Sequence, residues 1–97
     1  MLTNRGFMEW EKVGLVKASQ HRQSILKIIA ESSITPKEIA TTLGIHLSQV
    51  TRSLREMEKQ NIVHCLTPNL RKGRIYAITE EGLEILNKIT PNTQGEG

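Results

Sequence analysis

The 97-residue chain has almost no cysteine and no long apolar run. Its one cysteine, Cys65, cannot close an intramolecular disulfide, which excludes the class of small secreted domains stapled by disulfides. No stretch is apolar over the length that a bilayer-spanning helix needs, and no charged and then apolar leader opens the sequence. We therefore expect a cytoplasmic protein without a membrane partner.

Aromatic residues are scarce as well, since the chain has one Phe, one Trp and one Tyr. Its core therefore has to be filled mainly by Ile, Leu and Val, and a chain of this length encloses one such core. We expect one domain over residues 8–89, between disordered tails at residues 1–7 and 90–97 that lack any apolar period. Few aromatics also weaken the alternative of structured-RNA binding, because recognition of RNA generally uses single strands whose bases stack on aromatic side chains.

Capping residues and apolar spacing predict helices in the middle of the chain. Ser19 can cap a first helix that ends near residue 31. Thr35 followed by proline starts a second helix over residues 36–43. Gly44 permits a sharp turn, after which apolar residues spaced by three and four predict a third helix over residues 47–60. Its apolar positions are Leu47, Val50, Leu54 and Met57.

A hairpin and a last helix are expected after the third helix. Asn61 suits a helix end in the left-handed conformation, and β-prone residues predict strands over 62–66 and 74–78. Thr79 can cap a final helix to residue 89. This helix is predicted to bury Leu83, Leu86 and Ile89.

The segment before the first helix is harder to assign. Its apolar pattern over residues 10–16 is too short to distinguish helix from strand. Burial is nevertheless expected for Trp10, Val13, Leu15 and Val16.

The two short helices joined through Gly44 match a helix-turn-helix unit, whose second helix enters the DNA major groove. At 100° per residue, the third helix carries a polar stripe opposite its apolar face. The stripe comprises Ser48, Arg52, Arg55 and Lys59, with Gln49 and Thr51 beside it. Arginine can bond bidentately to guanine and glutamine to adenine, whereas hydroxyls and other basic groups can hold phosphate. A solvated helix face accounts for such a stripe equally well when it stands alone.

A second basic cluster surrounds Gly73 at the tip of the predicted hairpin. Arg71, Lys72 and Arg74 could hold a phosphate backbone there, and a basic stripe followed directly by a basic hairpin is hard to explain without nucleic acid. The net charge of +3 agrees with such a partner. Thr35 and Lys37, at the start of the second helix, are further candidates for phosphate contacts.

These residues resemble the winged helix-turn-helix transcriptional regulators, in particular a group of small archaeal regulators. The resemblance spans residues 10–89 and rests on TPKEIA at 35–40, LGI at 43–45, VTRSLREME at 50–58, and a run from LTP at 66–68 to RKGRIYAITEEG at 71–82. It implies a mainly α fold with a small β-hairpin, in which helix 47–60 reads double-stranded DNA and the hairpin over 62–78 is the wing. It also implies that the final helix assists dimerisation.

The chain departs from this pattern at the start of the third helix. Similar regulators usually have a small polar residue where His46 stands, and histidine is a poorer N-cap. Leu47 follows at a position that is often polar, and it could pack inward, touch a thymine methyl or be exposed.

Surplus apolar residues at the two ends of the domain predict a homodimer. They are Met8, Trp10, Leu15, Val16 and Ile85 opposite Leu83. Twofold symmetry would match a palindromic site with half-sites about 10 base pairs apart.

Other chemistries have little support in the sequence. The candidate ligands His21, His46, His64 and Cys65 lack metal-site spacing, since neighbours on a strand point to opposite faces, and no cofactor is expected. An enzyme is not expected either, because the chain has no glycine-rich phosphate loop and no recognisable Ser/His/Asp motif. Cys65 could be a redox switch, although a cysteine on an apolar strand is more often a small buried hydrophobe. The alternative function is a winged helix that binds protein in a larger assembly, which would not require the basic stripe.

Overall fold

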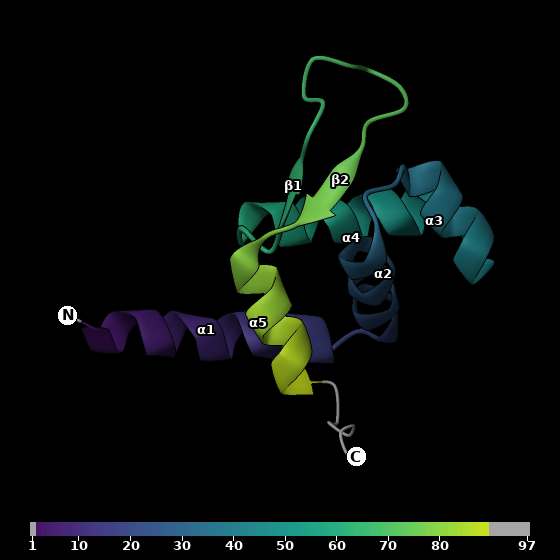
Figure 1. Ribbon diagram of the computed structural model, residues 1–97. Helices are drawn as coiled ribbons and strands as arrows, with labels where there is room; N and C mark the ends of the chain where they lie inside the picture. Colours follow the sequence, from purple (N-terminus) through teal and green to yellow (C-terminus); the bar gives the residue numbers. More distant parts are fainter. Residues whose placement is uncertain (1, 90–97) are drawn as a thin grey trace.

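The computed structural model describes residues 2–89, with side chains described from Trp10 onward. These residues form the helices α1 (Leu2–Lys17), α2 (Gln20–Glu31), α3 (Pro36–Leu43), α4 (Leu47–Lys59) and α5 (Glu80–Ile89), and the strands β1 (Val63–Cys65) and β2 (Tyr76–Ile78). Helix α2 contacts α1, α3, α4, α5 and β2. Figure 1 shows the hairpin rising beside α4, with α1 and α5 crossing at the opposite end. The mainly α fold class with a small hairpin is confirmed.

The helix limits follow from the capping residues that the sequence analysis identified. The Ser19 hydroxyl accepts a hydrogen bond from the Arg22 backbone N–H (3.3 Å) at the start of α2. Thr35 and Glu38 form a reciprocal capping box at the start of α3. Gly44 ends α3 with φ 69°, a left-handed conformation that costs glycine little. Asn61 has φ 61° directly after α4, as predicted.

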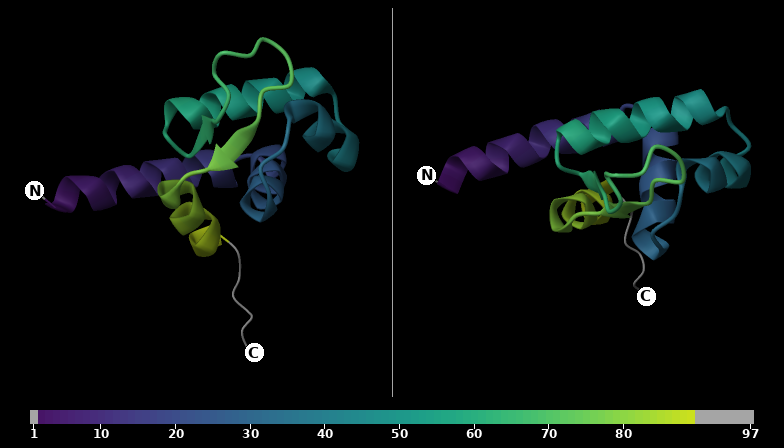
Figure 2. Two further views of the ribbon diagram at one scale, coloured as in Figure 1. Left: turned by 45° about the horizontal axis from the view of Figure 1, so that its top comes forward. Right: turned by 90° about the horizontal axis from the view of Figure 1, so that it is seen from above.

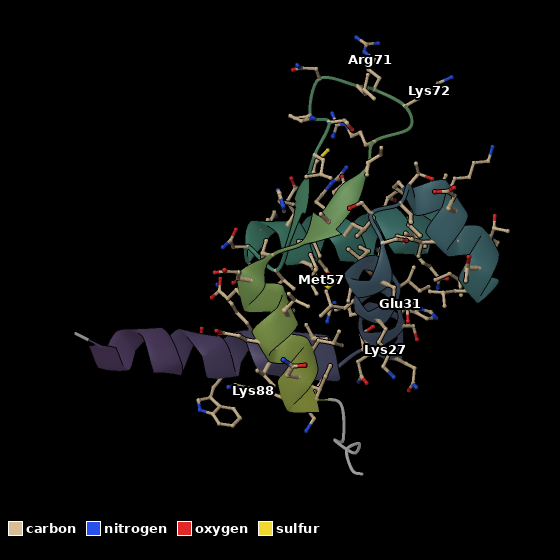
Figure 3. The ribbon with its side chains drawn as sticks, viewed as in Figure 1. Lys27, Glu31, Met57, Arg71, Lys72 and Lys88 are labelled. Carbon is tan, nitrogen blue, oxygen red and sulfur yellow. The ribbon has the colours of Figure 1, made fainter. Side chains whose placement is uncertain are left out.

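The core is aliphatic and lies between α2, α4 and the hairpin. Its fully buried side chains come from every helix and from the start of β1, and Figure 3 shows Met57 directed inward from α4. The largest are Ile25, Leu26, Ile39, Leu54, Met57, Ile62 and Ile85. Tyr76 is the only aromatic residue among the buried side chains described, in agreement with the expected Ile, Leu and Val core.

Helix α1 differs from the predictions for the first part of the chain. It runs from Leu2, so the expected tail at residues 1–7 is wrong for residues 2–7, whereas Met1 and the expected tail at 90–97 lie outside the described residues. Val13 and Val16 are buried against the core, and this packing holds one part of α1 in helical form. Because a formed turn nucleates the helix, each further residue adds a backbone hydrogen bond at a small cost in conformational entropy, so the helix extends toward Leu2. Trp10 is 67% exposed, contrary to its expected burial, and Leu15 is half-buried. Both views in Figure 2 show α1 extending well beyond α5.

The hairpin is antiparallel, with Val63 paired to Ile78 and Cys65 to Tyr76. Its strands are shorter than predicted because the ladder gives way to loop contacts, in which the Thr67 hydroxyl accepts from the Ile75 N–H (3.0 Å). On its other edge, β2 forms a single bridge to the link between α2 and α3, where the Tyr76 N–H donates to the Ile34 carbonyl (3.1 Å). This bridge anchors the hairpin to the helical body.

The buried face of α5 agrees only in part with the predicted one, since Leu86 and Ile89 pack against the core and Leu83 does not. Gly82 and Ile85 are buried and Leu86 and Ile89 are half-buried, whereas Leu83 is 43% exposed. The helix is rotated because Gly82 lies directly against the backbone of Ile62. A glycine contributes no apolar signal, so spacing alone could not reveal this face.

Helices α1 and α5 are also joined by a partly buried ion pair. The Lys12 ammonium donates to the Glu81 carboxylate (2.7 Å), and Lys12 is only 8% exposed. The side-chain amide of Asn61 donates to the other oxygen of Glu81 (3.2 Å). These bonds join α1 to the start of α5 and to the residues that follow α4.

The contact at Gly82 predicts a large effect of a single methyl group. A Cβ there would lie 2.3 Å from the Ile62 carbonyl oxygen and 2.7 Å from Ile78 Cγ1, so Gly82→Ala should destabilise the protein by about 2 kcal/mol or more, measured by urea denaturation. Gly14→Ala is the matched control, since no atom lies within 4 Å of its Cβ position, and it should stabilise α1 by about 0.5–1 kcal/mol. Equal effects of the two substitutions would contradict the close packing of α5.

Candidate nucleic-acid interface

The polar stripe of α4 lies at the surface. The opposite face of α4 is buried and consists of Val50, Ser53, Leu54 and Met57. The polar stripe therefore points away from the core. All of the predicted contact residues on this helix are exposed, namely Ser48, Gln49, Thr51, Arg52 and Arg55, and so is Lys59. Donor groups suited to bases and phosphates are therefore presented along the whole helix.

A groove of about 690 Å³ lies between α4, the start of α3 and the hairpin loop. It brings together residues that are far apart in the sequence, and most of the predicted contacts line it. They are Thr35, Lys37, Thr51, Arg55, Arg71, Lys72 and Arg74. Glu58 is the acidic residue among the groove's lining residues, against five basic ones, so the groove is strongly positive.

The remaining predicted residues lie on the other side of α4. Ser48 and Arg52 line a second, open hollow with Lys59, while Thr51 and Arg55 border both hollows. Gln49 borders neither. The α4 surface therefore has one side facing the hairpin loop and one side facing away from it.

Sequence reasoning did not propose three residues that line the groove, namely Pro36, Glu58 and Tyr76. Leu47, which the sequence left with three possible roles, lines it as well. Leu47 is 47% exposed, so it does not pack inward. Glu58 follows Arg55 by three residues, and this spacing placed it on the same side of the helix.

Thr35 is already committed to α3. Its hydroxyl accepts from the Glu38 N–H (3.2 Å) and also contacts the Glu38 carboxylate (3.2 Å). The carboxylate therefore occupies the helix N-terminus, where a phosphate was expected to bind. Lys37 is exposed next to it and remains available.

The hairpin loop presents two cations to solvent. Figure 3 shows Arg71 and Lys72 pointing outward from its tip, and no described residue forms a hydrogen bond or ion pair with either. Arg74 differs from them, since its Nε–H donates to the Leu70 carbonyl (2.6 Å) across the loop.

The outer face of α4 is supported from behind by Arg22 of α2. The Arg22 guanidinium donates to the Glu56 carboxylate and to the Leu15 carbonyl (2.8 Å). It therefore neutralises an acidic residue beside the polar stripe. This bond also fixes α4 against α2.

The candidate metal ligands do not converge. His64 is exposed and Cys65 is half-buried against the core, so the two neighbours face opposite sides of β1 as predicted. Among the side chains that the structure describes, no group of three or more His, Cys, Asp or Glu residues could hold a metal ion. The helices within residues 2–89 include none with the length and hydropathy of a membrane span.

Residues 19–64, just under half of the chain, match a family model described as winged helix-turn-helix DNA-binding. No curated protein sequence matches the chain. Among solved structures, the homodimeric winged helix-turn-helix domain of a possible ArsR-family regulator from Mycobacterium bovis is similar, with a TM-score of 0.67 and 20% identity over 89% of this chain and 76% of that one. The fold is winged helix-turn-helix. Helices α3 and α4 form its helix-turn-helix unit, and the hairpin is its wing.

Two larger regulators also have this winged helix-turn-helix fold. A transcriptional regulator from Thermotoga maritima has a TM-score of 0.65 and 25% identity over 90% of this chain. The repressor CouR, solved with a 23-mer DNA duplex, has a TM-score of 0.65 and 22% identity over 90% of this chain. This chain spans 66% of the length of each of these two proteins.

The start of α4 predicts a stability gain from a better cap. His46 forms no side-chain capping bond, and the Gln49 and Val50 N–H groups instead share its carbonyl (3.0 and 3.3 Å). His46→Ser should therefore raise the free energy of unfolding by about 0.5–1 kcal/mol, measured by urea denaturation without DNA. The control is Thr35→Ala, which removes an existing cap and should cost about 1 kcal/mol. A loss of stability in His46→Ser would contradict an uncapped α4.

Proposed function

We propose that this chain binds double-stranded DNA in a sequence-specific manner as a transcriptional regulator, with α4 in the major groove and the wing on the phosphate backbone. The observation that carries the proposal is the positive groove between α4, α3 and the wing, which joins the two basic clusters of the sequence into one surface. A solvated helix face does not explain this convergence, because the wing belongs to a different part of the fold.

The residues of this surface divide into two roles by position. Ser48, Gln49 and Arg52 lie in the first half of α4 and are fully available, so they are assigned to base edges. Arg55 and Lys37 face the groove, and Arg71 and Lys72 project from the wing tip, so these four are assigned to phosphates. Thr51 borders both hollows and donates to the Ser48 carbonyl (3.1 Å), which leaves its oxygen to accept a further bond.

The comparisons support a DNA-binding role. The family model covers α2, α3, α4 and the start of β1, which is the part that carries the proposed reading helix. CouR, which has the same fold, is a repressor solved on duplex DNA. The finer resemblance to small archaeal regulators stays a prediction.

We also propose that the protein acts as a homodimer. Val16 and Ile85 are fully buried within one chain, so the prediction that they are surplus apolar residues is wrong. The side chain of Met8 lies outside the described residues. The proposal now rests on Trp10 and Leu83, which stay exposed, and on the part of α1 that extends beyond α5. The similar domain from Mycobacterium bovis is homodimeric.

The division of roles predicts different effects of substitutions in α4 and in the wing. Arg52→Ala should cost about 1–3 kcal/mol on a duplex selected from random sequences and much less on a scrambled duplex. Lys72→Ala should weaken both duplexes about equally and reduce the slope of log K against log salt by about 0.9, because one phosphate contact is lost. Fluorescence titrations at several salt concentrations measure both effects.

Arg52→Lys is the matched control, since it keeps the charge and removes the bidentate fork, and it should lose discrimination nearly as Arg52→Ala does. An unchanged ratio of selected to scrambled affinity in both Arg52 variants would show that α4 is not the reader. A wild-type protein that binds neither duplex DNA nor RNA would contradict this proposal and favour the alternative function, a winged helix that binds protein in a larger assembly.

The single tryptophan offers a direct test of the dimer. Trp10 is exposed in one chain, so its fluorescence emission should shift to the blue as the protein concentration rises and dimerisation buries it. Trp10→Glu should give a monomer by sedimentation equilibrium at tens of micromolar. Thr42→Glu, which adds the same charge at an exposed site on α3, should remain dimeric. A wild-type protein that sediments only as a monomer, free and on DNA, would overturn this proposal.

A further inference from the structure

The wing loop between β1 and β2 is closed by hydrogen bonds at its base. The Leu66 N–H donates to the Ile75 carbonyl (2.7 Å), and the Ile75 N–H donates to the Thr67 hydroxyl (3.0 Å). Within the loop, the Leu70 N–H donates to the Thr67 carbonyl (3.1 Å) and makes a turn. In segment 70–74 of the loop, no backbone–backbone hydrogen bond joins one end of the segment to the other.

Arg74 closes this last segment with its side chain. Its Nε–H donates to the Leu70 carbonyl (2.6 Å), which joins the two ends of a five-residue stretch. Gly73 has φ 68°, a left-handed conformation that lets the chain turn back inside the stretch. Between the joined ends lie Arg71 and Lys72, the two cations that point outward in Figure 3.

We infer that Arg74 is the positioning residue of the wing, which holds the loop so that Arg71 and Lys72 face the DNA backbone. This inference rests on the proposed function and gives Arg74 a different role from the phosphate contact that the sequence predicts for it. A loop without this bond samples more conformations, and the conformational entropy lost on binding then weakens the complex. The bond therefore acts through the two cations that it positions.

Two substitutions separate the bond from the charge. Arg74→Lys keeps the positive charge but places a methylene group where the Nε donor stands. Arg74→Gln removes the charge but keeps an N–H donor at the same number of bonds from the backbone. A positioning role predicts that glutamine substitutes better than lysine, whereas a phosphate contact predicts the opposite order.

The first measurement is amide hydrogen exchange of the free full-length protein. In Arg74→Lys the amides of Leu70 and Ile75 should exchange roughly two- to tenfold faster than in the wild type, as expected for the loss of one hydrogen bond. In Arg74→Gln they should exchange at nearly the wild-type rate. Core amides should not change in either variant, because Arg74 is exposed and lies outside the core.

The second measurement is affinity for the selected duplex at several salt concentrations. Arg74→Lys should bind several-fold more weakly than Arg74→Gln. The control is Arg71, which makes no hydrogen bond or ion pair to any described residue, so Arg71→Lys should bind better than Arg71→Gln. The lysine variant should therefore bind the duplex more tightly than the glutamine variant at position 71, and more weakly at position 74.

The inference is overturned if Arg74→Lys keeps both loop protection and affinity while Arg74→Gln loses affinity and about 0.9 of the salt slope, which is the result for a phosphate contact. If the wild-type protein binds no duplex, the proposed function fails, and with it the assigned effect on DNA. The exchange rates then decide separately whether Arg74 holds the loop.

Discussion

The approach of α5 to the backbone of Ile62 is the contact on which the rest of the structure depends. Gly82 allows this approach, because any side chain there would collide with the Ile62 carbonyl. Beside it, Thr79 caps α5 by accepting from the Gly82 N–H (2.9 Å). The Asn61 and Ile62 carbonyls (2.7 and 2.9 Å) share the single proton of its hydroxyl. The end of α4, the start of β1 and the start of α5 therefore meet at one place. This junction sets the direction of the wing relative to α4, and the positive groove follows from that direction.

The proposed interface combines rigid support with free side chains at its surface. The Arg22 guanidinium holds α4 from behind through Glu56, and the bridge from Tyr76 to Ile34 holds the wing against the helices. The outer cations, such as Arg52 and Lys72, are exposed and keep the freedom to adapt to DNA. A binding surface gains affinity when its backbone is ordered before binding, because less conformational entropy is then lost. The similar regulators of known structure share the fold that carries this surface.

Predictions from local signals were the most accurate ones. The limits of α3, the left-handed Asn61 and the Thr79 cap each depend on residues within one turn, so the sequence was sufficient to place them. Predictions of burial from apolar type alone were weaker, since Leu83 and Trp10 are exposed. Burial depends on which side of a helix packs against a neighbouring element. On α5 it is the side of Gly82, because the absence of a side chain there lets the helix approach the Ile62 backbone. The length of α1 depended in turn on the packing of Val13 and Val16, which local patterns do not report.

The sequence by itself determined the winged helix-turn-helix pattern and the polar stripe of α4, because helical periodicity and caps are short-range properties. Only the tertiary structure decided that Lys37, Arg55 and the wing cations line one groove, since these residues are brought together by contacts between separate elements. It also decided that Thr35 and Arg74 are not equivalent to their neighbours. Both are polar residues next to other predicted contacts in the sequence, but each side chain already forms an intramolecular hydrogen bond. Such a bond depends on where folding places the donor and the acceptor.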